Sequence, residues 1–125
     1  MIDQIHWQTI TSLTKTNDVI FYGDIKSHDI VKKYNNRHLN REIMDLKFFK
    51  FKERLRHKCF ELNKVFIAVN ECYTSKTCTN CGVLNDVKDL ETYKCTSCNI
   101  TIDRDINGAR NILLKGLDSV CVPSR

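Results

Sequence analysis

The amino-acid sequence predicts an α/β fold that carries a four-cysteine zinc ribbon, and three observations support this prediction. Two C-x-x-C pairs stand 13 residues apart in the second half of the chain, an arrangement typical of a metal site. Two short apolar runs, at residues 19–22 and 65–69, are rich in β-branched and aromatic residues, which favour strands. Between these runs, apolar residues recur at every third or fourth position, as on one face of a helix.

Length and composition restrict the class of protein. The chain has 125 residues, 42% of them hydrophobic, which is enough for one modest domain or two small ones that gain stability from a metal. No apolar run approaches the ~20 residues that span a membrane, so we expect no membrane partner. Lys and Arg number 20 against 15 Asp and Glu. Most of the excess lies in residues 39–64, which hold eight basic and four acidic residues.

The first segment of the chain has weak helical periodicity. Ile5, Ile10 and Leu13 can line one face of a short helix. We expect Trp7 to lie in the core and not to serve as a platform for stacking bases.

Each of the two predicted strands ends close to an acidic residue. The first, at 19–22, is stopped by Gly23 and followed by Asp24. The second, at 65–69, is followed by Glu71. Acids at strand ends are candidates for metal ligands, although a solvated acid at a strand end is also common.

The basic segment between the strands predicts one continuous helix within residues 39–64, with Asn40 as its cap. We interpret the apolar face as core, including Cys59, and we expect the basic residues to lie mostly on the solvated side. A basic helix face is often only solubilising, but it is also what phosphate binding requires. The apolar face consists of Met44, Phe48, Phe51, Leu55, Cys59 and Leu62, and the basic residues are Lys47, Lys50, Lys52, Arg54, Arg56 and Lys58.

The two C-x-x-C pairs are Cys78 with Cys81 and Cys95 with Cys98. Each pair can wrap a tight turn that aims both thiolates at one point, and two such turns complete the tetrahedral sulfur shell that zinc prefers. Disulfides or buried free thiols are the alternatives. Because no apolar signal segment precedes the pairs, we favour a reducing compartment and zinc. A shell of four sulfurs leaves no position for water, so we expect the zinc to be structural.

Residues around the cysteines predict the local structure of the ribbon. Gly82 follows the first pair, where a left-handed residue is commonly needed, and residues 92–94 can form a strand before the second pair. After the ribbon, a helix is predicted from Ile106 to Lys115, with Gly116 as its stop.

Acidic residues flank the ribbon on both sides. Glu71 precedes it, and Asp103 and Asp105 follow it, so closing the zinc site can bring the flanks together. Carboxylates from separate elements bind Mg²⁺ in sites that cleave phosphodiesters. Alternatively, Asp103 is a helix N-cap and Glu71 is solvated.

The motifs YTSKTCTNCG, YKCTSC and DRDINGARNIL resemble the carboxy-terminal zinc ribbon and third RuvC motif of TnpB proteins, the RNA-guided nucleases of insertion sequences. Type V CRISPR effectors and Fanzor proteins are similar. The resemblance covers about residues 18–117. It implies a partial RNase H-like (RuvC) unit at 1–70, a zinc ribbon at 71–102 and a closing helix and tail at 103–125.

The resemblance also implies roles for the acids. The family's last catalytic aspartate lies in a D-x-N-[AG]-A pattern, which matches Asp105, while Asp103 caps the helix or is solvated. The second acid normally belongs to an E-D-L pattern, and this chain has Gly23-Asp24-Ile25 instead. As in relatives with a rearranged site, Glu71 can replace that acid, and we favour it over Asp24.

The first acid of a RuvC site has no counterpart in this sequence. We therefore expect a TnpB-like or Fanzor-like fragment that binds DNA and guide RNA, keeps part of a magnesium-dependent nuclease site, and is inactive without an amino-terminal nuclease portion. The alternatives are a non-catalytic zinc ribbon that binds nucleic acid or protein, and a decayed remnant.

Overall fold

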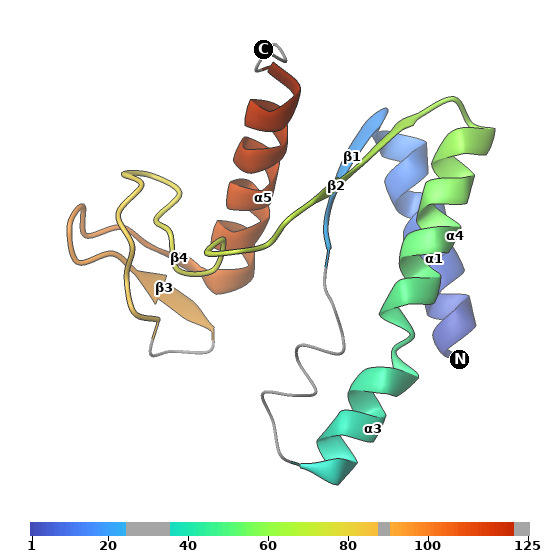
Figure 1. The fold of residues 1–125 in the computed structure, drawn as a ribbon, viewed down its shortest axis with the longest axis horizontal. Coiled ribbons are helices and arrows are strands. Elements are labelled where there is room, and N and C mark those ends of the chain that lie inside the picture. Colours follow the sequence, from blue (N-terminus) through green and yellow to red (C-terminus); the bar gives the residue numbers. More distant parts are fainter. Residues whose placement is uncertain (25–35, 88–90, 122–125) are drawn as a thin grey trace. The chain divides into compact units, whose positions relative to one another are not determined.

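The computed structural model describes residues 1–24, 36–87 and 91–121 of the chain. These residues form a mixed α/β structure of two compact units, residues 1–67 and 68–125, each with its own core (Figure 1). Within the described residues, no helix is long and apolar enough to cross a membrane.

The first unit packs helices against a two-stranded sheet. The core is formed by buried residues of α1, β1 and α4, and α1 lies along α4 (Figure 1). Strand β1 pairs with β2, where the N–H of Val65 donates to the carbonyl oxygen of Asp18 at 2.9 Å. Both strands form where the apolar runs predict them. The elements are α1 (Ile2–Thr16), β1 (Val19–Gly23), α3 (Arg37–Asp45), α4 (Phe48–Glu61) and β2 (Val65–Val69), which continues into the second unit.

The prediction of one continuous helix between the strands is wrong. The chain forms α3 and α4, separated at Lys47, whose φ of 52° is left-handed. At this break the Nε2–H of His6 donates to the carbonyl oxygen of Leu46 at 3.0 Å, so α1 binds a carbonyl that a continuous helix would use. The cap is also different, because the side chain of Asn36, not Asn40, accepts from the first backbone N–H groups of α3.

Only the middle of the predicted apolar face is core. Leu55 and Cys59 are buried, whereas Met44 is 57% and Leu62 44% exposed. Trp7 was expected in the core but is 45% exposed, and the guanidinium of Arg54 lies 5.5 Å from its ring centroid. A cation over an indole ring stabilises a partly solvated tryptophan.

The basic side chains of the α4 region are largely paired with acids, not simply solvated. Five of the six form ion pairs within the first unit, which reduces the positive charge available to a phosphate backbone. The pairs are Lys47–Asp3 at 3.7 Å, Lys52–Asp24 at 2.9 Å, Arg54–Asp3 at 2.7 Å, Arg56–Glu53 at 2.9 Å and Lys58–Glu61 at 3.1 Å.

The second unit joins a small hairpin to a long helix. Strand β3 (Thr92–Lys94) pairs antiparallel with β4 (Thr101–Asp103), so that Tyr93 faces Ile102. Helix α5 (Arg104–Cys121) follows immediately, and Asp103 caps it as predicted by accepting from the N–H groups of Asp105 and Ile106 at 2.9 and 3.1 Å.

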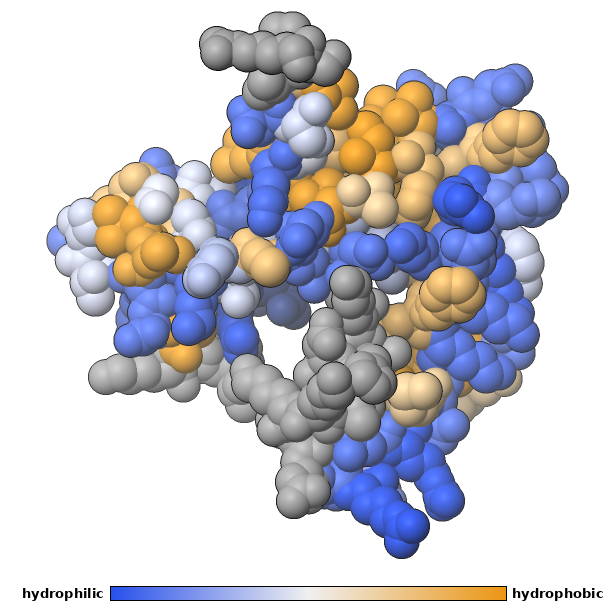
Figure 2. All heavy atoms as spheres, in the orientation of Figure 1, coloured by the Kyte–Doolittle hydropathy of each residue, from blue (hydrophilic) through white to orange (hydrophobic). Residues whose placement is uncertain are grey.

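Helix α5 does not end at Gly116 as predicted. Gly116 is buried within the helix, which continues to Cys121. A glycine inside a helix costs only about 1 kcal/mol relative to alanine, which the rest of the helix can offset. Residues 116–121, beyond the predicted end, are therefore helical, and 122–125 lie outside the described residues. Figure 2 shows apolar residues at the surface over α5, where Leu113 and Leu117 are 44% and 42% exposed.

Candidate metal centre

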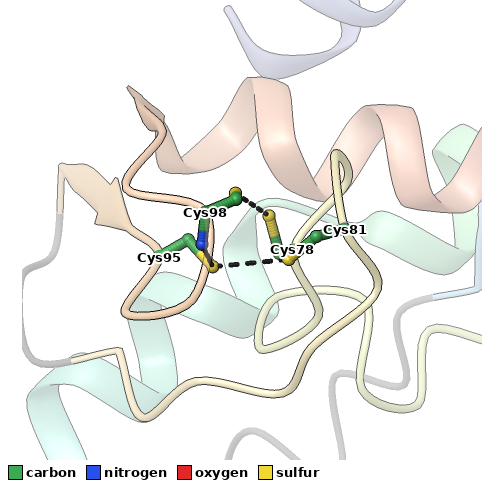
Figure 3. A group of neighbouring side chains, drawn as sticks. All are labelled: Cys78, Cys81, Cys95 and Cys98. Carbon is green, nitrogen blue, oxygen red and sulfur yellow. Dashed lines mark hydrogen bonds between the residues drawn. The ribbon is translucent and has the colours of Figure 1, made fainter.

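The structure brings the four cysteines of the two C-x-x-C pairs together. Their sulfur atoms all lie within 4.8 Å of one another. The Sγ of Cys81 is 3.6 Å from that of Cys95, and the Sγ of Cys78 is 3.7 Å from that of Cys98 (Figure 3). Each close contact thus joins one pair to the other.

These distances fit a tetrahedral metal and not a disulfide. A disulfide has an S–S distance of about 2.05 Å, and all four cysteines are free. Zinc–sulfur bonds of about 2.3 Å in a tetrahedron place the sulfurs about 3.8 Å apart. The cysteine cluster, which is the name we use for Cys78, Cys81, Cys95 and Cys98, can therefore hold a metal such as zinc.

A left-handed residue directly follows the second cysteine of each pair. Gly82 has a φ of 77°, as predicted, and Asn99 has a φ of 59°. The reversal lets the N–H of Cys78 donate to Val83 O at 2.8 Å and the N–H of Cys95 donate to Ile100 O at 3.0 Å. The two turns are built alike, and each returns the chain alongside its first cysteine.

The sulfur of Cys95 accepts several hydrogen bonds. The backbone N–H groups of Ser97 and Cys98 donate at 3.4 and 3.5 Å, and the side-chain amide of Asn85 donates at 3.4 Å. Backbone donors, first that of Cys98, lower the pKa of Cys95 to about 6. N–H groups directed at sulfur favour the thiolate, the form that binds metal.

The pKa of Cys81 is shifted in the opposite direction. The backbone at Val83 acts to lower its pKa, but burial and the sulfurs of the other three cysteines outweigh that contribution and raise the pKa of Cys81 to about 11. Four thiolates at these distances repel one another. A divalent cation at the centre of the cluster removes that repulsion.

Asn85 was not singled out in the sequence. It is only 6% exposed, and its Oδ1 accepts from the backbone N–H of Thr96 at 2.9 Å and from its hydroxyl at 2.8 Å. Its Nδ2 also lies 2.8 Å from the hydroxyl of Tyr93, which donates to Lys76 O at 2.9 Å. This buried network connects the two cysteine pairs independently of any metal.

The two acids predicted to bind magnesium belong to the second unit. Asp105 lies exposed in the first turn of α5. Glu71 follows β2 and is half-buried, and its carbonyl accepts from the N–H and hydroxyl of Thr74 at 3.1 and 2.8 Å. Among the described residues, the cysteine cluster is the one group of three or more His, Cys, Asp or Glu close enough to hold a metal. Asp24, the alternative acid, belongs to the first unit.

Buried asparagines of α5 hold the loop that carries the first cysteine pair. Asn107 is fully buried, and Asn111 is 8% exposed. Both bond to backbone atoms of Thr77, with Nδ2 to O distances of 2.9 and 2.7 Å. Asn107 belongs to the D-x-N pattern, and the spacing of the two asparagines by four residues places them on one helix face, which is a sequence signal for shared contacts.

A comparison with protein families identifies this arrangement. Residues 48–112, which include the cysteine cluster and the first half of α5, match the family model described as the Cas12f1-like TNB domain. The TnpB-like protein L79 of Acanthamoeba polyphaga mimivirus is 36% identical over 116 residues, which are 90% of this chain and 22% of that protein. The chain belongs to the TnpB family.

Other proteins match this chain over a similar share of its length. The putative transposase A625R of Paramecium bursaria Chlorella virus 1 is 32% identical over 94% of this chain and 27% of its own length. A putative RNA-guided DNA endonuclease of Streptomyces pristinaespiralis is 29% identical over 86% of this chain and 26% of its own length. This TnpB-family chain therefore spans about a quarter of the length of the curated relatives it matches.

Proposed function

We propose that this chain is a zinc-stabilised segment of a TnpB-type, RNA-guided DNA nuclease. The proposal assigns a partial RNase H-like (RuvC) unit to residues 1–70, a zinc ribbon to 71–102, and a closing helix and tail to 103–125. DNA is the substrate and a guide RNA the second partner in this proposal, because two relatives are named putative RNA-guided DNA endonucleases. The observation that carries the proposal is that helix α5, which contains Asp105, is hydrogen-bonded to the loop around Cys78. We call this loop the cysteine loop.

In this proposal the cysteine cluster holds a structural zinc, and Glu71 and Asp105 are magnesium ligands. Magnesium, when bound, supplies charge stabilisation and an activated water for phosphodiester hydrolysis. Asp105 suits this role because its carboxylate is exposed at the amino end of α5, where the helix dipole stabilises negative charge. Its own N–H is bound by Asp103, which fixes the first turn.

The segment corresponds in this proposal to the carboxy-terminal part of a longer nuclease, whose amino-terminal portion supplies the first acid. We expect no cleavage by the chain alone. Cleavage is expected when the chain replaces the matching segment of a complete homologous nuclease, and Asp105→Ala should abolish it. Magnesium-dependent cleavage that survives Asp105→Ala would contradict the assignment.

Glu71 is the second acid in this proposal. The position of Glu71 supports that choice, because it follows β2 and belongs to the same compact unit as Asp105. In the same chimeric nuclease, Glu71→Gln should remove magnesium-dependent cleavage and Asp24→Asn should leave it. Loss only in Asp24→Asn would transfer the role to that residue.

A non-catalytic zinc-ribbon module is the second candidate. The observation in its favour is that the described residues bring no three acids or histidines together outside the cysteine cluster. Such a module would bind nucleic acid or protein in the chimera, but Asp105→Ala would not change cleavage by the chimera. The same cleavage assay therefore separates the two candidates.

Nucleic-acid binding by α4 can be tested by its dependence on salt. Because Lys47, which precedes α4, and four basic residues of α4 itself are ion-paired, we expect few phosphate contacts and a shallow slope of log affinity against log salt. A gel shift with single-stranded DNA tests this expectation when the salt concentration is varied from about 50 to about 200 mM. A steep slope that Lys50→Ala reduces would show that α4 binds phosphates despite these pairs.

A further inference from the structure

The side chain of Asn107 forms hydrogen bonds to the backbone on both sides of Cys78, a member of the cysteine cluster. Its Oδ1 accepts from the backbone N–H of Thr79 at 3.0 Å, and its Nδ2 donates to the carbonyl oxygen of Thr77 at 2.9 Å. Thr77 and Thr79 are the two neighbours of Cys78. The side chain is fully buried, so water cannot replace either bond if the amide is removed.

Asn111 extends the same attachment by one helical turn. Its Nδ2 donates to the carbonyl oxygens of Thr74 and Thr77 at 2.8 and 2.7 Å. The hydroxyl of Thr77 is itself used internally, donating to Tyr73 O at 2.8 Å. Helix α5 is thus attached to the cysteine loop by two amides that satisfy backbone groups of the loop.

Asp105 lies two residues before Asn107 in the same turn of α5. The turn is held from its outer side by the Asp103 cap and from its inner side by Asn107. The position of the Asp105 backbone therefore depends on the loop around Cys78, whose sulfur belongs to the cysteine cluster.

We propose that Asn107 is a positioning residue that couples metal occupancy of the cysteine cluster to the position of the turn carrying Asp105. The importance of that turn rests on the proposed function, but the coupling itself does not. Thermodynamic linkage requires reciprocity: if zinc stabilises the docking of α5, then docking of α5 strengthens zinc binding by the same factor.

The first test is zinc affinity, measured by competition with a chromophoric chelator on the full chain. Asn107→Ala should weaken zinc binding roughly 10- to 100-fold, the usual cost of losing a residue that supports metal ligands. Asn107→Asp keeps the acceptor for Thr79 but turns a carboxylate oxygen toward the carbonyl oxygen of Thr77 in a fully buried position, so it should weaken zinc binding at least as much as Asn107→Ala. Arg110→Ala, at an exposed position of the same helix, is the matched control and should bind zinc like the wild type.

The second test separates coupling from general loss of stability. With saturating Co²⁺, Asn107→Ala and the wild type should give the same absorption bands of a tetrahedral four-sulfur site, because the ligands are unchanged. Hydrogen exchange at the amides of 106–111 should accelerate when zinc is removed from the wild type. In Asn107→Ala these amides should exchange quickly with or without zinc.

The proposal would be overturned if the zinc affinity of Asn107→Ala were within about twofold of that of the wild type, because the expected loss is at least about 10-fold. Zinc-dependent protection that persists in that variant would also overturn it. If Asn107→Ala does not fold even with zinc, Asn111→Ala, which removes the second amide attached to the same loop, decides by the same two measurements.

Failure of the coupling and failure of the proposed function give different results. Asp105→Ala should leave zinc affinity unchanged, since no bond to the cysteine loop is lost. If it also leaves cleavage by the chimeric nuclease unchanged, the nuclease assignment fails while the coupling stands. If it abolishes cleavage but Asn107→Ala retains zinc affinity and protection, the coupling fails while the assignment stands.

Discussion

The side-chain amide of Asn85 lies 3.4 Å from the sulfur of Cys95, and the same amide also contacts Tyr93 and Thr96. A neutral residue thus connects the two halves of the cysteine cluster from outside the ligand shell. Amide donors to a metal-bound thiolate reduce the repulsion between sulfurs and orient the ligand.

We predict that Asn85→Leu, which keeps the approximate volume of the side chain, lowers zinc affinity roughly 10-fold or more. It removes the donor to Cys95 and the buried side-chain oxygen that accepts from the N–H and hydroxyl of Thr96. Chelator competition measures the effect. Ser97→Ala is the control, because only the backbone of Ser97 reaches the sulfur, and equal affinities for the two variants would refute the role of Asn85.

A second prediction concerns the left-handed turns. Gly82→Ala should destabilise the zinc-bound protein by about 1 kcal/mol, because a φ of 77° is unfavourable for a residue with a Cβ. Added volume is not the cause, since a Cβ at this position meets no atom within 4 Å. Asn99→Gly at the equivalent turn should be neutral or slightly stabilising. Urea unfolding with excess zinc compares the two, and an unchanged midpoint for Gly82→Ala would contradict the explanation.

Removal of zinc should loosen the second unit and leave the first intact, because each has its own core. The cysteines are internal probes for this prediction. Cys59 is buried in the first unit, and burial raises the pKa of its thiol, so it should resist alkylation before and after chelation. Cys78 and Cys95 should become alkylated after chelation, as mass spectrometry can show. Rapid labelling of Cys59 upon chelation would mean that the two units unfold together.

The ion pair of Asp3 with Arg54 predicts a pH dependence of the first unit. The hydrogen bond from Arg54 lowers the pKa of Asp3 from its ordinary value of 3.8. A carboxyl with a lowered folded-state pKa contributes stability that is complete above 3.8 and is lost as the pH falls through the folded-state pKa.

Asp3→Asn should therefore be less stable than the wild type near neutral pH, and the difference should disappear in acid. Fluorescence of Trp7, the single tryptophan, reports on this region because Arg54 lies over its ring. Urea titrations at several pH values measure the difference. A difference that stays constant from neutral to acidic pH would show that Asp3 acts by packing and not by charge.

Local features of the fold were predictable from the sequence. The strands at 19–23 and 65–69, the left-handed Gly82 and the Asp103 cap all follow from rules that involve a few neighbouring residues. The meeting of the cysteines was also predictable, because the spacing of two tight turns leaves few ways to place four sulfurs. These features depend on local conformational preference and on the chemistry of thiolates.

The tertiary structure decided the features that depend on distant partners. The break at Lys47 arises where His6, from another helix, binds the carbonyl of Leu46. Asn107 and Asn85 find their acceptors and donors 28 and 11 residues away along the chain. A buried polar group must be satisfied, but the sequence pattern does not reveal which distant backbone group will satisfy it, since that depends on how the elements pack.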